Sequence, residues 1–127
     1  EPSTVRPAMT ASRPSSGHPT MNDQEFNDMR TNIERVFADL YLIDISTLNA
    51  DQRKLHQRSL SAAYLALVNA EHSTLGQLTE DVKTQLIPLA LNVQRLQHEV
   101  SGLPTPYEKL EAVAKELSAF GRLAQLL

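Results

Sequence analysis

Apolar side chains recur at alternating steps of three and four residues through most of this chain, from about residue 22 to its end. This spacing places them on one stripe of an α-helix, because a helical turn holds about 3.6 residues. A β-strand would need apolar side chains at every second residue, and no stretch with a clean alternation has a partner stretch elsewhere. The pattern therefore predicts an all-α protein.

Short breaks that contain capping and helix-ending residues divide the periodic region. Asn22 can cap the first helix, and Asn49 or Asp51 can cap the second. Gly102 belongs to a stop signal, and residues 105–108 (Thr-Pro-Tyr-Glu) have the pattern of a capping box. The third segment has two candidate starts, near residues 74 and 79, and its proline predicts a kink or a break because that residue lacks a backbone N–H. The expected helices cover residues 23–44, 50–72, 75–101, kinked near Pro88, and 106–125.

The connections between these segments are only a few residues long, so that successive helices should run antiparallel. We expect an antiparallel up-and-down four-helix bundle over residues 22–127. The alternative is a three-helix bundle with a loosely docked first helix. Residues 1–21 are rich in Pro, Ser and Thr and poor in aliphatic side chains, which predicts a disordered leader or linker.

The composition excludes several classes of protein. The chain has no cysteine, which rules out a disulfide scaffold, a thiolate metal site and a cysteine nucleophile. It has 12 Lys and Arg against 15 Asp and Glu residues, whereas a nucleic-acid-binding protein needs a surplus of cations. No apolar run approaches the length of a membrane span. No signal-peptide pattern is present, so a cytoplasmic and a secreted location both stay open.

Catalytic and metal-binding motifs are also missing. There is no Gly-x-Ser-x-Gly motif, no phosphate-binding glycine loop and no Glu-x-x-His pair, so we expect no enzyme activity and no cofactor. In the expected bundle His56 and His98 fall at similar heights on antiparallel helices. Their positions relative to the apolar stripes favour solvent-exposed histidines without partners over metal ligands.

Two of the expected helices carry more apolar side chains than one stripe can hold. With a turn centred near residue 77, Tyr64 would lie beside Leu91 and Val68 beside Ile87, which gives the hairpin a second apolar face. Helices that are apolar over most of their circumference are normally buried, so these side chains could simply be core. As a functional hypothesis, they form a groove that accepts an amphipathic helix of a partner.

Three cations, Arg53, Lys54 and Arg58, lie near the start of the second expected helix, where the helix dipole disfavours positive charge. One interpretation is a solvated basic patch. The other is a site for an anionic partner such as an acidic peptide.

These observations lead to the hypothesis of a non-enzymatic helical protein-interaction module, with an apolar surface and a basic margin. Its partner would be a protein or an amphipathic peptide, and monomer and homodimer both stay open. One alternative is a secreted or translocated bacterial-type protein, an effector or antigen, with residues 1–21 as export leader. Another is a carrier of a small apolar ligand inside the bundle.

Overall fold

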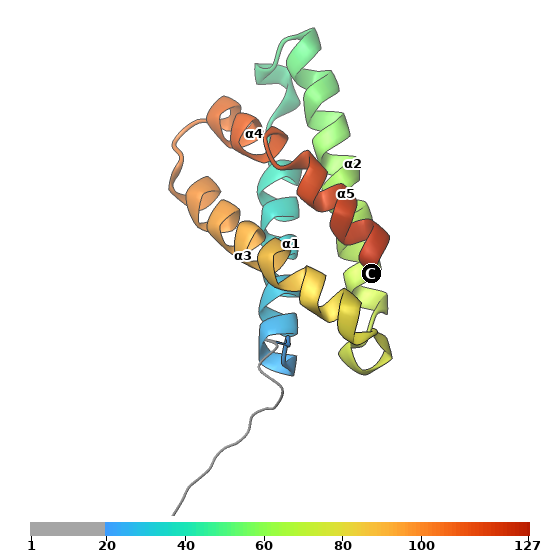
Figure 1. Ribbon diagram of the computed structural model, residues 1–127. Coiled ribbons are helices and arrows are strands. Elements are labelled where there is room, and N and C mark those ends of the chain that lie inside the picture. Colours follow the sequence, from blue (N-terminus) through green and yellow to red (C-terminus); the bar gives the residue numbers. More distant parts are fainter. Residues whose placement is uncertain (1–19) are drawn as a thin grey trace, which may run out of the picture.

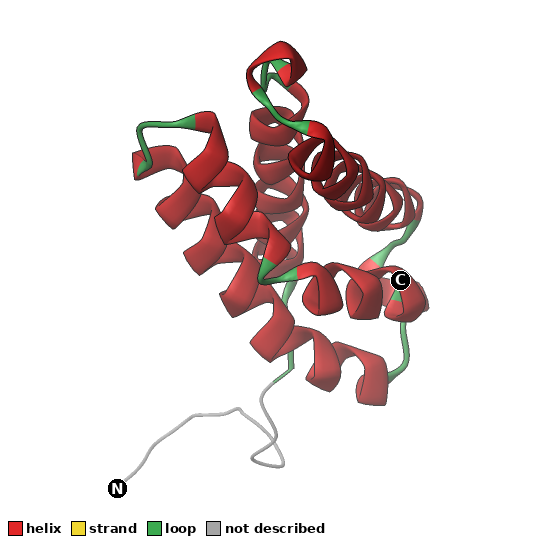
Figure 2. Cartoon of the chain, turned by 90° about the horizontal axis from the view of Figure 1, so that it is seen from above, coloured by secondary structure: helices red, strands yellow, loops and turns green. Residues whose placement is uncertain are grey.

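The computed structural model describes residues 20–127, and in this part of the chain every regular element is a helix (Figures 1 and 2). The all-α prediction is confirmed. The leader was predicted to be disordered, and its residues 1–19 lie outside the described part of the chain. The elements are α1 (Asp23–Tyr41), η2 (Ile45–Thr47), α2 (Ala50–His72), η3 (Leu75–Gln77), α3 (Glu80–Gly102), α4 (Pro106–Ala114) and α5 (Leu117–Leu126), where η denotes a 3-10 helix.

Reciprocal hydrogen bonds cap the first two long helices. The Asn22 side chain accepts from the backbone N–H of Glu25 (2.8 Å), and the Glu25 carboxylate accepts in return from the Asn22 backbone N–H (2.9 Å). Asn49 and Gln52 repeat the arrangement at the start of α2, with both distances at 2.8 Å. Each exchange satisfies two backbone donors that a helix start leaves free.

The start of α3 falls at the later of the two candidate positions. The Thr79 hydroxyl accepts from the backbone N–H of Val82 (3.2 Å), whereas the Thr74 side chain makes no capping bond and opens only the short η3 turn. The α-helix continues without a break through Pro88 to Gly102. Thr84, whose carbonyl loses its usual donor to that proline, lies on the exposed surface, where water replaces the missing bond.

Met21 belongs to the folded part of the chain, although its position next to the Pro/Ser/Thr-rich segment led us to assign it to the leader. Its side chain is buried and belongs to the same core as Phe26. The two residues occupy the positions just before the N-cap and four residues after it, which is the spacing of a hydrophobic staple. A single apolar residue before a cap is enough to fix how the chain enters a helix.

The last predicted helix is divided into α4 and α5. The break lies at Lys115 and Glu116, where the Glu116 backbone leaves the helical region (φ −111°, ψ 18°). Neither residue is a helix breaker, so the break follows from packing. It allows Val113 on α4 and Phe120 on α5, both fully buried, to reach the same core from differently directed helices.

The helices do not pack in the expected order. Helix α1 packs against both α2 and α3, while α5 packs against α2 and α3 from another side. Helices α2 and α3 meet at the loop of residues 73–79 and then diverge, with no extended contact between them (Figure 1). The up-and-down bundle is therefore not confirmed, because its consecutive helices would pack along their lengths.

Small residues on the buried face of α2 allow its neighbours to approach closely. Ala63, Ala66 and Ala70 are fully buried, and Ser59 continues the same face one turn earlier. The Ser59 hydroxyl has no hydrogen-bond partner, and it is the one such fully enclosed side-chain polar atom in residues 20–127. A buried hydroxyl without a partner lowers stability, because it loses its bonds to water and gains none.

Replacing Ser59 by Ala should therefore stabilise the protein by about 1–2 kcal/mol, because the unpaired hydroxyl disappears while the small volume is kept. Ser61→Ala is the matched control, since Ser61 is exposed on the same helix and, measured on the monomeric protein, reports the difference in helix propensity, about 0.5 kcal/mol. Urea unfolding of both variants measures the difference. Equal stabilities of the two variants would show that the buried hydroxyl carries no penalty.

Candidate functional site

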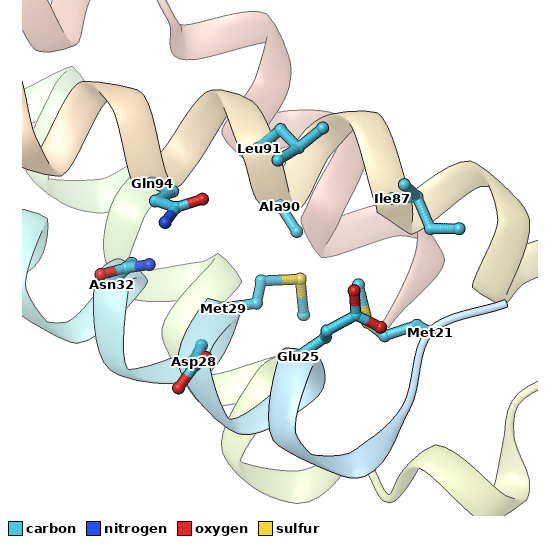
Figure 3. A pocket seen from close by; sticks show the side chains of 9 residues that line it. All are labelled: Met21, Glu25, Asp28, Met29, Asn32, Ile87, Ala90, Leu91 and Gln94. Carbon is cyan, nitrogen blue, oxygen red and sulfur yellow. The ribbon is translucent and has the colours of Figure 1, made fainter. Parts of the chain in front are cut away.

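A half-open groove of about 180 Å³ lies between the N-terminal half of α1 and the middle of α3 (Figure 3). It lies where α3 packs against α1. The side chains that line it are Met21, Glu25, Asp28, Met29, Asn32, Ile87, Ala90, Leu91 and Gln94.

The floor of the groove is formed by two thioethers. Met29 and Met21 are almost completely buried, and the Met29 sulfur lies between the two helices, facing Ala90 (Figure 3). The methyl side chain of Ala90 leaves room above it. Methionine has three rotatable bonds and a polarizable sulfur, so that such a floor adapts to differently shaped apolar groups.

The α3 wall is apolar and open to solvent. Ile87 and Leu91 are one helical turn apart and therefore share a face of α3, above the floor (Figure 3). Leu91 is 55% exposed. Transfer of such a side chain out of water is favourable by about 25 cal/mol for each Å² of apolar surface covered.

The α1 rim of the groove is acidic. The Glu25 carboxylate takes part in the cap of α1, and Asp28 accepts a hydrogen bond from the Gln24 side chain (2.8 Å). Neither carboxylate has a cationic partner, because the one ion pair found in residues 20–127 joins Lys83 to Glu80 (3.0 Å) on α3. The rim therefore carries two negative charges balanced by hydrogen bonds alone.

The structure brings together only part of the predicted binding surface. Ile87 and Leu91 line the groove, but Tyr64 and Val68 lie on α2, which packs against another side of α1. The expected pairs, Tyr64 with Leu91 and Val68 with Ile87, do not form. The prediction assumed that two helices joined by a short turn pack along their lengths, whereas α2 and α3 diverge and each packs against α1.

The three predicted cations lie away from the groove. Arg53, Lys54 and Arg58 are exposed and lie in the N-terminal half of α2. The Arg53 side chain is engaged locally, because its Nε–H donates to the backbone oxygen of Ile45 (3.0 Å) and so ties the loop before α2 to that helix. The margin of the groove is consequently acidic, and the basic margin belongs to a different surface.

The groove residues of α1 were not predicted as site residues. Met29 belongs to the apolar stripe of α1, and a stripe residue is expected to be covered completely by neighbouring helices. Glu25 and Asp28 resemble ordinary acidic residues near a helix start. A sequence signal does exist, since Met21 and Met29 are two of only three methionines in the chain.

His56 has a structural role that differs from the expected exposed position. It is only 7% exposed, and its Nε2 lies 2.7 Å from the backbone oxygen of Leu40. Because a carbonyl oxygen only accepts, Nε2 carries the proton and donates it. Leu40 lies in the last turn of α1, where its oxygen also accepts from the backbone N–H of Ile43 (3.2 Å), and the bond from His56 connects α2 to this end of α1.

Removal of this donor should destabilise the fold. We expect His56→Leu to lower the free energy of unfolding in urea by about 1–3 kcal/mol, because the Leu40 oxygen loses a buried bond. His56→Gln should lower it less, because the glutamine amide can donate from a similar position. His98→Leu, at an exposed position on α3, is the control and should change stability by less than about 0.5 kcal/mol. A His56→Leu variant as stable as the control would contradict the assigned role.

Within residues 20–127 no three His, Asp or Glu side chains gather closely enough to bind a metal ion. No helix in that range has both the length and the apolarity that crossing a membrane requires. Comparison with protein-family models, curated proteins and solved structures finds no match. The chemistry of the groove therefore carries the functional interpretation.

Proposed function

We propose that this chain is a non-enzymatic protein-binding module whose α1–α3 groove holds the apolar side chains of a cationic amphipathic helix. The observation that carries the proposal is the combination of an open apolar hollow with a thioether floor and two rim carboxylates that lack cationic partners. The two features lie side by side, so that one ligand segment can use both.

The size and lining of the groove favour a peptide over a small molecule. Pockets that enclose drug-sized ligands have volumes of about 300–1,000 Å³. The groove, at about 180 Å³, is smaller than this and open on one side, which suits one or two side chains that project from a larger partner. Helix-in-groove recognition uses such anchors, and methionine-rich surfaces accept anchors of several shapes. The alternative of a small-ligand carrier gains no support from this volume.

The charge of the rim selects the partner. A Lys or Arg one turn away from the apolar anchor would reach Glu25 or Asp28, whereas an acidic peptide would be repelled by both. This preference is opposite to the one inferred from the cations on α2. The hypothesis of an exported effector or antigen stays a prediction, since it rests on residues 1–21.

Methyl NMR of methionine tests the proposal directly, because Met21 and Met29 lie in the groove. Titration with a synthetic amphipathic helix of Leu and Lys should shift both methyl signals saturably. Leu91→Lys should abolish the shifts, because it puts a charge where an apolar contact is needed. The protein should still fold, since Leu91 is half exposed.

Two charge-removing substitutions test the acidic rim of the groove. Glu25→Gln and Asp28→Asn remove the charges but keep the hydrogen-bonding atoms, including the capping box that Gln can also complete. In the double variant the affinity for the Leu/Lys peptide should fall about tenfold and lose most of its dependence on salt. Equal binding of a Leu/Glu peptide by the unchanged protein, or unmoved methionine signals, would refute the proposed function.

A further inference from the structure

Helix α2 has an exposed stripe that runs its full length on the side opposite its buried face. The steps along this stripe alternate between four and three residues, the spacing that lets two helices pack side by side over several turns. None of its residues is buried, although the middle of the stripe is apolar and Leu65 is 54% exposed. The stripe consists of Lys54, Arg58, Ser61, Leu65, Val68 and His72.

An aromatic cluster extends the apolar middle of the stripe toward α1. Tyr64 is 55% exposed and packs against Phe37, with 5.6 Å between the ring centres, and Phe37 packs against the exposed Tyr41 at 5.9 Å. The rings stabilise one another, but nothing in residues 20–127 covers their outer side. Tyrosines held in place in this way lose little entropy when another surface packs on them.

Charge is distributed unevenly along the same helix. Lys54 and Arg58 lie in its N-terminal half, one turn apart and without an anionic partner among the described residues, so that they repel each other. Glu71 lies at the other end, beside the stripe, where the helix dipole is negative. The cations of the stripe are thus concentrated in one half of the helix, and an anion lies near its other end.

We infer that the α2 stripe is a homodimer interface, in which the α2 helices of two copies pack antiparallel about a two-fold axis near residue 63. In this register residue 54 faces residue 72 of the second copy, 58 faces 68, and 61 faces 65. The cations at each N-terminal half then approach Glu71 and the negative helix end of the other copy. One surface thereby complements itself, as a two-fold interface must.

The geometry provides enough length for such an interface. Helix α2 has 23 residues and is therefore about 35 Å long. A stable interface needs about 800 Å² from each subunit, so the contact would extend from the α2 stripe to the exposed Tyr41 and Tyr64 beside it. The acidic groove lies on the α3 side of α1, away from α2, so the dimer does not rest on the proposed function of that groove.

Sedimentation velocity of the full chain over a range of concentrations tests the inference. The unchanged protein should sediment as a dimer, and Leu65→Lys should raise the dissociation constant about tenfold or more. Because Leu65 is half exposed, this variant should fold, which circular dichroism checks. A protein that stays monomeric at all concentrations would overturn the inference.

Charge exchange tests the antiparallel register without touching an apolar side chain. Lys54→Glu and Glu71→Lys should each weaken the dimer, and the double variant should restore most of the lost affinity, because opposite charges then face each other again. A double variant weaker than both single ones would overturn the proposed arrangement.

Leu91→Lys is the control at the other surface. It should leave the dimer unchanged, while Leu65→Lys should leave the response of the methionine signals to the Leu/Lys peptide unchanged. Dimerisation that is lost in Leu91→Lys and kept in Leu65→Lys would assign the self-contact to the groove and overturn the α2 interface.

Discussion

Burial of one stripe of α1 is the interaction on which the rest of the structure depends. Met29, Ile33, Val36 and Leu40 are almost inaccessible to solvent, and both α2 and α3 pack against the helix that carries them. Full burial of each such side chain contributes about 1.5–3 kcal/mol. Both α2 and α3 pack on α1, and they do not pack along each other.

The two sides of α1 are joined to their neighbours by different means. On the α2 side, alanines permit close approach and His56 binds the end of α1 through the Leu40 oxygen. The side chains of Asn69 and Ser73 then donate to the backbone oxygens of Ala124 and Leu127 (2.8 and 2.9 Å), which joins α5 to the end of α2. On the α3 side, the groove lies between the N-terminal half of α1 and the middle of α3.

Local features of the sequence predicted the helices well, and their three-dimensional order poorly. Asn22 caps the helix it was expected to cap, and Asn49, one of two candidates beside Asp51, caps the second, because a cap depends on residues within one turn. The break at Lys115 carries no local signal, and the order of packing depends on which stripes fit each other. The sequence also identified Ile87 and Leu91 as candidate binding residues, but it placed them beside α2, whereas they lie beside α1. Which helices become neighbours depends on this packing order and not on local sequence.

The α2 stripe is cationic and the groove is acidic, so the stripe of one copy could bind the groove of another. The α2 stripe presents apolar side chains beside cations, which is the chemistry that the acidic groove is proposed to accept. Contact between the stripe of one copy and the groove of the next would leave a free site at each end, and such head-to-tail contacts grow into open chains. Pairing of two α2 stripes prevents this growth, because both sets of cations are then covered and no end remains. The closed dimer would therefore keep the grooves free for another protein, and self-association and partner binding would use separate faces of the same helical framework.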